Sequence, residues 1–242
     1  MTRTLEWAGC VNVRDLGGVP IAGGGETRYG VLVRADKIRR LHDDGWAALA
    51  EHGVTRVVDL RWPEELAQDP PREVDLDVVH VSLLGPLDRG YESNIEHYME
   101  REDPAGFWST QYLEFLDRYR TEFGRAIGAI ADADGAVLFH CAGGKDRTGL
   151  IAALLLRLAG AEIDDVASEY ALSGPNLHRR PNPWVEAAPT EDERRQRLFM
   201  GQTPPEAMAR TLRDLGDVAA YLRSAGVTDE QVARLKERLG AP

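Results

Sequence analysis

The segment His140-Cys-Ala-Gly-Gly-Lys-Asp-Arg-Thr-Gly149 contains the residues of this chain that are best suited to covalent chemistry. Cys141 and Arg147 lie in it with five residues between them. A cysteine thiolate is a strong nucleophile, and backbone N–H groups and the positive end of a following helix favour that charged form. An arginine guanidinium donates two parallel hydrogen bonds to phosphoryl oxygens, which a lysine cannot do. The pair therefore predicts attack of Cys141 on a phosphoryl group whose oxygens Arg147 binds.

The five residues between this cysteine and this arginine are expected to bind the phosphoryl oxygens. Small residues and glycines allow the backbone to curl with its N–H groups inward, as a nest that fits a tetrahedral oxyanion such as phosphate or sulfate. We expect Lys145 to add positive potential and Asp146 to hydrogen-bond the backbone and hold the loop open. The expected phosphate-binding residues are Ala142, Gly143, Gly144, Lys145, Asp146 and Arg147.

Two neighbours of the loop are expected to support this chemistry. We expect His140 to orient the loop by hydrogen bonding rather than to act as a base, because the nest already favours the thiolate. Thr148 can offer its hydroxyl to the sulfur and assist its departure in a second step. The competing interpretation is that Cys141 is inert, as isolated buried cysteines usually are. Cys10 is expected to be such a buried residue, with a reversible disulfide to Cys141 as the alternative.

The loop is expected to connect a strand to a helix. An apolar run at residues 136–139 precedes it, and an aliphatic pattern of helical period at 148–158 follows it. Residues 174–202 mix prolines, arginines and acids without periodicity, which predicts a mobile loop with a helical piece. Further strands are predicted within 11–20 and at 29–34, 54–60 and 77–84, and further helices at 41–52, from Pro63, and at 91–101, 106–131, 163–172, 208–223 and 228–239.

The composition is that of a globular chain with an acidic surface. The 242 residues are 43% hydrophobic and 29% charged, which favours one domain over residues 1–242 and argues against disordered, fibrous and membrane classes. The net charge of −11 disfavours nucleic acid and anionic lipid, so an anionic substrate needs a local positive site. Two cysteines, no signal-peptide pattern and no apolar segment of bilayer length predict a cytoplasmic protein without stable membrane insertion. The composition does not indicate an oligomeric state.

The loop resembles the Cys-x5-Arg phosphate loop of the cysteine-dependent protein tyrosine phosphatase superfamily. Its form is similar to that of bacterial dual-specificity tyrosine/serine phosphatases related to mycobacterial protein tyrosine phosphatase B. The resemblance covers nearly the whole chain and is weakest at residues 174–202. Three further segments carry it: Asn12-Val-Arg-Asp-Leu-Gly-Gly18, Val57-Val-Asp-Leu-Arg61 with Glu64 or Glu65, and Ala220-Tyr-Leu-Arg-Ser-Ala-Gly226.

The resemblance implies a three-layer α/β fold, in which helices flank a central, mostly parallel sheet. It also implies phosphatase activity through a phosphocysteine, without a metal or cofactor. The six scattered histidines agree with this, since none forms metal-ligand spacing with another. The expected order of substrates is phosphotyrosine in a protein first and a phosphoinositide second, with phosphoserine and phosphothreonine as further alternatives. Lys145 and Asp146 are linked by the resemblance to additional phosphates and hence to phosphoinositides.

An aspartic acid is needed to protonate the leaving oxygen, and it must reach that atom from beside the loop. Asp88, which follows the predicted strand 77–84, best matches the position of the acid in the related enzymes. Asp59 and Asp146 are the alternatives.

Other residues are expected to support the site from outside the loop. Arg14 and Asp15 could brace the phosphate loop, because buried polar groups need partners, and Arg61 could do the same or contact the substrate. Residues 90–110 and 174–204 flank the loop in chain order and would form a helical lid, as in the related enzymes.

Three other functions share parts of this pattern. The P-loop of NTPases also contains Gly-Lys, but Asp146 stands where Ser or Thr should bind magnesium and Phe139 where the first glycine should be. A sulfurtransferase also carries a reactive cysteine between a strand and a helix, but Arg147 followed by Thr148 favours the phosphatase. A non-catalytic phosphate-binding adaptor would keep the fold without turnover, although Cys141 is present.

Overall fold

The computed structural model describes residues 3–83 and 90–240, and within them five strands form one sheet in the order β1-β2-β5-β3-β4. Strand β1 pairs antiparallel with β2, and the other three pairings are parallel. The strands are β1 (Arg14–Asp15), β2 (Leu32–Ala35), β3 (Val54–Asp59), β4 (Asp77–His80) and β5 (Ala136–His140). The prediction of a mostly parallel sheet is confirmed, with β5 at its centre.

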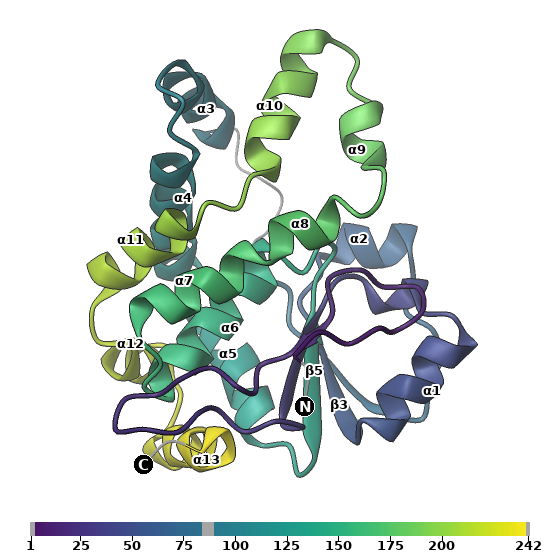
Figure 1. Cartoon of the computed structure of the whole chain (residues 1–242), viewed down its shortest axis with the longest axis vertical. Coiled ribbons are helices and arrows are strands. Elements are labelled where there is room, and N and C mark those ends of the chain that lie inside the picture. Colours follow the sequence, from purple (N-terminus) through teal and green to yellow (C-terminus); the bar gives the residue numbers. More distant parts are fainter. Residues whose placement is uncertain (1–2, 84–89, 241–242) are drawn as a thin grey trace.

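Helices cover both faces of this sheet, which gives three layers (Figure 1). Successive side chains of a strand point to opposite faces, so each strand contributes to two apolar clusters. Leu138 packs in one cluster with Leu49 of helix α1 (Asp43–Glu51). Val137 and Phe139 pack in the other with helices α5 (Arg120–Ala131) and α6 (Asp146–Leu158). The predicted three-layer α/β architecture is thereby confirmed.

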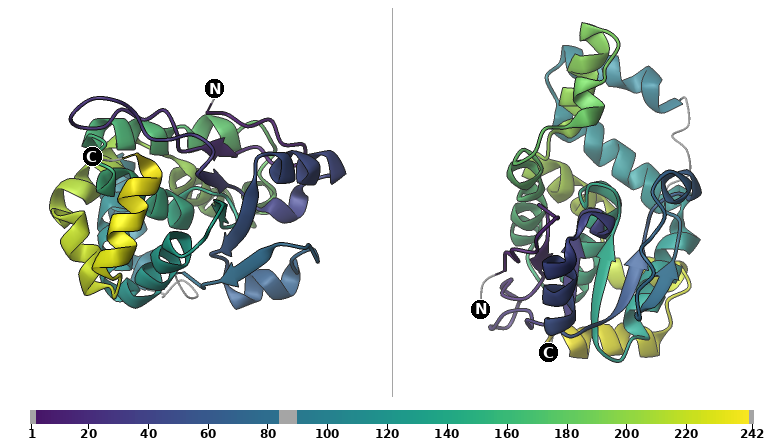
Figure 2. Two further views of the ribbon diagram at one scale, coloured as in Figure 1. Left: turned by 90° about the horizontal axis from the view of Figure 1, so that it is seen from below. Right: turned by 90° about the vertical axis from the view of Figure 1, so that its right-hand side faces the viewer.

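The remaining helices lie around these layers and beyond one end of them. Figures 1 and 2 show α3, α9 and α10 projecting together from that end of the molecule. These helices are α2 (Pro63–Gln68), α3 (Gly90–Glu100), α4 (Pro104–Arg118), α7 (Ile163–Ala171), α8 (Ser173–Leu177), α9 (Pro183–Glu186), α10 (Glu191–Gly201), α11 (Pro205–Leu215), α12 (Val218–Ser224), α13 (Asp229–Leu239) and the 3-10 turn η1 (Ile38–Arg40). Among the described residues, no helix is both long enough and apolar enough to cross a membrane.

Three predictions of secondary structure were wrong. The helix predicted at 106–131 is two helices, because Tyr119 leaves helical dihedrals (φ −108°, ψ 28°) although the apolar face continues past it. The helix predicted at 208–223 is broken at Gly216, whose φ is +73°, and a new helix begins with Asp217 as its cap. Residues 174–202 are largely helical rather than loop, and α10 escaped detection because most of its residues are polar and give no apolar period.

Candidate active site

The loop that carries Cys141 leaves the carboxyl end of the central strand and enters the first turn of α6. Cys141 is buried, with 2% of its surface exposed. Arg147 and Thr148 belong to the first turn of α6, where backbone N–H groups have no partner within the helix. These N–H groups and the helix dipole favour an anion beside the sulfur. The predicted strand, loop and helix are confirmed, with the helix beginning two residues earlier than expected.

The loop carbonyls face outward and are held by other parts of the chain. The C=O and N–H of one trans peptide unit point in opposite directions, so each outward carbonyl turns the next N–H inward. Gly144 adopts a φ of +66°, which a glycine tolerates without steric cost. Three hydrogen bonds fix the carbonyls: Lys37 N to Ala142 O at 3.1 Å, Asn12 Nδ2 to Gly143 O at 3.0 Å and Arg34 Nη2 to Gly144 O at 2.6 Å. This orientation is the one that a phosphate nest requires.

The residues that hold the loop are themselves fixed by a buried carboxylate. Glu169 of α7 accepts from Arg14 Nε at 2.5 Å and from Arg34 Nη1 at 2.5 Å. Arg14 also donates to Asn12 Oδ1 at 2.5 Å, so it reaches the loop through Asn12. Burial by itself would raise the pKa of Glu169, but Arg14, Arg34 and Arg3 lower it to about 2. Arg34 and Glu169 were not predicted from the sequence, because no local sequence pattern indicates contacts between residues so far apart along the chain.

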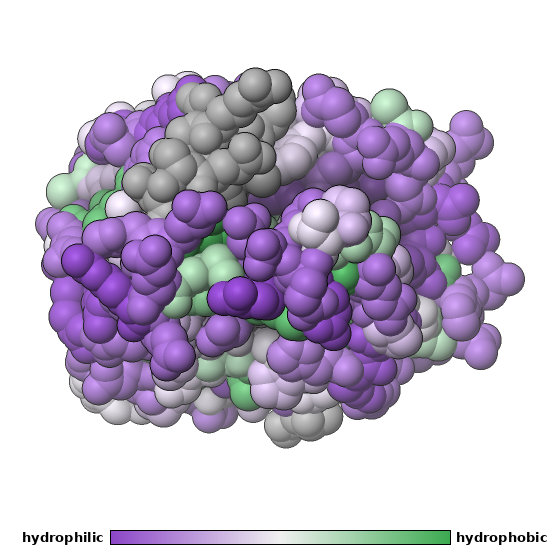
Figure 3. All heavy atoms as spheres, turned by 90° about the horizontal axis from the view of Figure 1, so that it is seen from above, coloured by the Kyte–Doolittle hydropathy of each residue, from purple (hydrophilic) through white to green (hydrophobic). Residues whose placement is uncertain are grey.

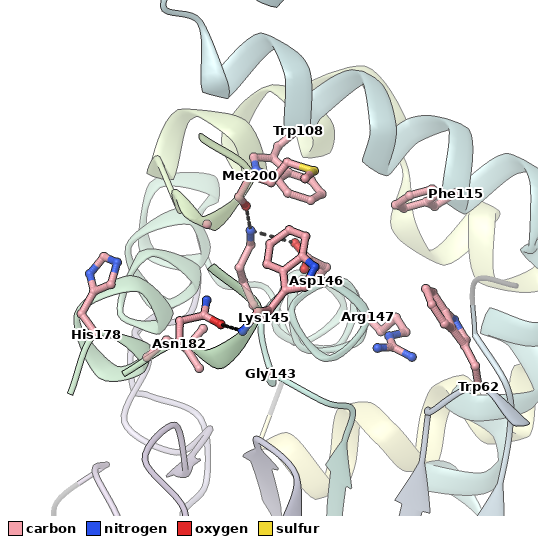
Figure 4. Close-up of a pocket in the computed structure, with 13 residues that line it drawn as sticks. Trp62, Trp108, Phe115, Gly143, Lys145, Asp146, Arg147, His178, Asn182 and Met200 are labelled. Carbon is pink, nitrogen blue, oxygen red and sulfur yellow. Dashed lines mark hydrogen bonds and ion pairs between the residues drawn. The ribbon is translucent and has the colours of Figure 1, made fainter. Parts of the chain in front are cut away.

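The guanidinium of Arg147 has one edge that binds Glu65 and another edge that can bind a ligand. Its Nη1 donates to Glu65 Oε2 at 2.5 Å and to Leu60 O at 3.3 Å, and its Nη2 donates to Glu65 Oε1 at 2.9 Å. The Nε–H and the second Nη2 hydrogen share the opposite edge, for which the described part of the chain supplies no acceptor. The guanidinium carbon lies 4.8 Å from the ring centroid of Trp62 (Figure 4). Arg147 can therefore present a two-pronged edge to a phosphoryl group.

Charges next to Arg147 keep it ionised. Burial would lower the pKa of Arg147, but the sulfur of Cys141 and the carboxylate of Glu65 raise it above its ordinary value. Glu65 pairs with Arg147, which decides between the two glutamates that the sequence motif allowed. Trp62 was not recognised from the sequence as part of the site.

The ammonium group of Lys145 contacts two oxygen atoms and the ring of a tryptophan. Its Nζ donates to the carbonyl of Met200 at 2.5 Å and lies 3.9 Å from the ring centroid of Trp108 and 3.4 Å from Asp146 Oδ1. Burial lowers the pKa of Lys145, against the opposing effect of Asp146. Asp146 also accepts from the hydroxyl of Tyr112 at 2.5 Å. Asp146 thus contacts side chains, where a bond to the loop backbone was expected.

A cavity of about 310 Å³ lies above the loop. Its walls are mainly aromatic and aliphatic, and its polar groups come chiefly from the loop (Figure 4). The face of the molecule that carries α9 and α10 is mostly hydrophilic, with apolar residues visible in its hollows (Figure 3). The cavity is lined by Trp62, Trp108, Phe115, Gly143, Lys145, Asp146, Arg147, Leu177, His178, Asn182, Trp184, Met200 and Gly201. A planar apolar group attached to a phosphate fits such walls.

His140, Asp59 and Arg61 form a buried cluster outside this cavity. Arg61 donates to both oxygens of Asp59, at 3.0 Å from Nε to each oxygen and 2.7 Å from Nη2 to Oδ2. Burial would raise the pKa of Asp59, but His140 and Arg61 lower it below its ordinary value. Burial lowers the pKa of His140, whose Nδ1 lies 3.2 Å from the carbonyl of Cys141 and can donate to it. This geometry suits His140, Asp59 and Arg61 as residues that orient one another and the start of the phosphate loop, rather than as residues that contact a substrate in the cavity.

Of the other predicted residues, Asp15 binds groups outside the phosphate loop: it accepts from the N–H groups of Gly17 and Gly30 and lies 3.0 Å from His52 Nε2. Thr148 is fully buried, and its hydroxyl oxygen has no hydrogen-bond partner in the described part of the chain. Asp88 lies outside the described residues. Cys10 is partly buried, where a buried residue was expected. Burial and Asp36 raise its pKa, and its sulfur contacts the carbonyl of Lys37 at 3.5 Å. Within residues 3–83 and 90–240, no three His, Cys, Asp or Glu side chains gather in a way that could hold a metal ion.

Comparison with known proteins supports the resemblance seen in the loop. A family model described as Tyrosine phosphatase family matches residues 5–241. A protein of Nostoc commune named Tyrosine-protein phosphatase is 33% identical over 226 residues, covering 86% of this chain and 74% of that protein. A Mycobacterium tuberculosis protein named Triple specificity protein phosphatase PtpB is 28% identical over 273 residues, covering 96% of this chain and 97% of that protein.

Proposed function

The chain belongs to the tyrosine phosphatase family, and from that premise we propose that it hydrolyses phosphate monoesters through a phosphocysteine at Cys141. One observation carries the assignment of the residues. The sulfur lies at the start of a loop whose N–H groups turn inward, and Arg147 offers a free edge of two donors beside it. Such preorganised donors stabilise the charge that develops on a transferring phosphoryl group.

In the first step, the thiolate of Cys141 attacks phosphorus in line with the ester oxygen. An S–P bond forms, the P–O bond to the leaving group breaks, and an aspartic acid gives the leaving oxygen a proton. The inward N–H groups and the free edge of Arg147 bind the three equatorial oxygens during transfer.

In the second step, water attacks the phosphocysteine and the same aspartate, now ionised, accepts its proton. The S–P bond breaks, inorganic phosphate is released and the thiolate is restored. The unpartnered hydroxyl of Thr148 can donate to the departing sulfur, which stabilises its negative charge.

For the general acid we propose Asp88, with Asp146 as the second candidate. Asp146 lines the cavity, which supports it, whereas Asp59 is held by Arg61 outside the cavity and its lowered pKa disfavours proton donation. Asp88→Asn and Asp146→Asn should be compared on aryl phosphates with good and poor leaving groups. Loss of the acid should slow the poor leaving groups most, because they depend most on protonation. If a variant slows aryl phosphates with good and poor leaving groups equally, the aspartate that it replaces is not the general acid.

We propose phosphotyrosine as the preferred substrate. The aromatic walls of the cavity support an aryl group, and the ammonium of Lys145 is already bound by Met200 and Asp146, which disfavours a second phosphate. We therefore expect slower turnover of phosphoserine and phosphothreonine, and the slowest turnover of phosphoinositides. Relative kcat/KM on a panel of phosphopeptides and phosphoinositides checks this order, and a faster phosphoinositide would reverse it.

We also propose that the segment 174–204, together with 90–110, acts as a cover for the site. Two contacts support this: Met200 binds Lys145 of the loop, and Phe199 packs on Phe107 with ring centroids 5.7 Å apart. Hydrogen exchange in these segments should slow when tungstate occupies the loop. Unchanged exchange would leave them as ordinary packing elements.

The nucleophile is tested by Cys141→Ser, with Cys10→Ser as the matched control. Turnover of a small aryl phosphate should be abolished by the first variant and kept by the second. Rapid acid quenching of the wild type should trap phosphate on the peptide that contains residue 141. An equally active Cys141→Ser would refute the mechanism, binding without turnover in the wild type would favour an adaptor, and a persulfide on Cys141 would favour a sulfurtransferase.

A further inference from the structure

Five basic side chains lie on two segments that are far apart in the sequence and that each adjoin part of the phosphate site. Two of them directly follow Leu177 and His178, which line the cavity. The others belong to the segment whose Lys37 N–H binds the carbonyl of Ala142 in the phosphate loop. We call this group the basic rim: Lys37, Arg39, Arg40, Arg179 and Arg180.

The two segments meet on the same N-terminal turn. Arg180 donates to the carbonyl of Gly9 at 2.5 Å, and the backbone of Gly9 touches that of Arg40 so closely that a Cβ at Gly9 would lie 2.0 Å from the Arg40 oxygen. Cys10 contacts the carbonyl of Lys37 on the same side. The basic rim is therefore one surface rather than two separate groups.

Carboxylates neutralise only part of this surface. Asp69 lies 2.7 Å from Lys37 Nζ and 4.0 Å from Arg39 Nε, and Glu6 lies 3.5 Å from Arg179. Arg40 and Arg180 have no carboxylate partner in the described part of the chain. Asp36 is nearby but fully buried, where it accepts from the N–H groups of Val11 and Asn12. A surplus of positive charge thus borders the cavity of a chain whose net charge is −11.

We propose that the basic rim binds acidic residues on either side of the phosphorylated residue in a protein substrate, an inference that rests on the proposed phosphatase function. The cavity has room for the phosphorylated side chain, so the flanking residues of an extended peptide must lie across its edge. An extended peptide advances about 3.3 Å per residue, so its flanking residues extend outward from the cavity over the surface around it. Opposite charges there raise the association rate and select among substrates.

An anionic membrane is the other surface that arginines and lysines could attract. The observations favour a peptide, because the net charge of −11 repels an anionic bilayer while a short acidic segment meets only the local surplus.

The test compares a phosphotyrosine peptide flanked by Glu and Asp with the same peptide carrying Gln and Asn. The variant Arg39→Gln/Arg40→Gln/Arg179→Gln removes three exposed charges of the rim. Arg210→Gln/Arg213→Gln/Arg234→Gln removes three exposed arginines on α11 and α13 and is the matched control. A small aryl phosphate, which cannot reach the rim, measures the basal activity.

The wild type and the control variant should prefer the acidic peptide. In the rim variant, the KM for the acidic peptide should be roughly three- to tenfold higher than in the wild type. The KM for the neutral peptide, and kcat/KM for the aryl phosphate, should remain as in the wild type. The preference should vanish near 1 M salt, where the screening length falls to about 3 Å.

Several results would overturn the proposal. An equal rise for both peptides would indicate damage to the site, and no rise for either would remove the role of the rim. Binding of the wild type, but not the rim variant, to vesicles of phosphatidylserine and phosphatidylcholine, without peptide discrimination, would assign the rim to lipid.

Anisotropy of labelled peptides on Cys141→Ser tests the rim without turnover. An inactive wild type that still discriminates the peptides would refute the proposed function and keep the rim.

Discussion

Each of the two loop cations lies against the face of a tryptophan. Arg147 lies on Trp62, and Lys145 lies on Trp108. A cation held on an aromatic face away from water interacts more strongly with it than at an exposed site. The rings therefore have two effects, since they orient the cations and form opposite parts of the apolar wall that would contact a substrate ring (Figure 4).

We predict that Trp62 positions Arg147. Trp62→Ala should lower kcat/KM for a small aryl phosphate by roughly tenfold or more, because the guanidinium loses a desolvated aromatic contact of about 1–2 kcal/mol. Trp62→Phe should recover most of this loss, because a phenyl face can still stack. Steady-state kinetics and tungstate affinity measure both effects.

Trp184→Ala is the matched control, because Trp184 also lines the cavity but carries Arg197 on its ring instead of a loop cation. Its effect should be smaller. Trp62 also donates its indole N–H to Leu83 O at 2.8 Å. If Trp62→Phe is as impaired as Trp62→Ala, loss of this hydrogen bond explains the effect and loss of stacking on Arg147 does not.

At the scale of elements, the phosphate loop depends on how closely β2 approaches it. Gly144 adopts a φ of +66°, and a Cβ there would lie 2.5 Å from the carbonyl oxygen of Ala35. Gly143 differs, because the nearest atom to its Cβ would be Leu177 Cδ1 at 3.9 Å, an ordinary contact. The backbone thus requires glycine at one of the two positions for steric reasons.

We predict that Gly144→Ala destabilises the protein by about 1–3 kcal/mol and weakens tungstate binding, through backbone strain and a clash with β2. Gly143→Ala should unfold at nearly the wild-type temperature. Thermal unfolding and titration calorimetry compare the pair. Equal stability of the two variants would mean that β2 yields without cost.

At the scale of the whole molecule, Glu169 connects α7 with β1 and β2, the two strands at one side of the sheet. It pairs with Arg14 of β1 and Arg34 of β2, and all three side chains are buried. A buried charge that loses its partner is strongly destabilising, so this group supports the fold and the phosphate loop together.

We predict that Glu169 makes the fold sensitive to acid. Its pKa is about 2 in the folded protein, below the ordinary value of 4.5, so its stabilisation is complete above about pH 4.5 and is lost as the pH falls towards 2. Roughly 3 kcal/mol of unfolding free energy depends on it. Glu169→Gln should lose most of this at neutral pH and show a flatter acid dependence.

Urea unfolding at a series of pH values measures this effect. Glu206→Gln is the control, because arginines also lower the pKa of Glu206 but 46% of its side chain is exposed. Its unfolding curve should stay near that of the wild type. Parallel acid profiles for the wild type and Glu169→Gln would refute the prediction.

The chemistry of the loop could be read from the sequence because its parts are contiguous. The nucleophile, the glycines and Arg147 lie within ten residues, so their spacing alone predicts a nest between a strand and a helix. Strands β3 and β5 were also predictable, because they are mostly buried and read as short apolar runs, whereas β1 is Arg14–Asp15 and was predicted from alternation alone. The single helix predicted at 106–131 was wrong, because apolar periodicity reports which side is buried and not where a helix changes direction. The helices within 174–202 were missed for another reason, since α10 is mostly polar and has no apolar period.

The partners of the loop were decided only by the tertiary structure. Glu65 precedes Arg147 by 82 residues, Arg34 precedes Gly144 by 110, and Glu169 follows Arg14 by 155. Hydrogen bonds and charge pairs act through space, so the packing of sheet and helices selects which of the many arginines and acids meet. The sequence by itself determined the chemistry of the loop, and the packing determined which groups orient it.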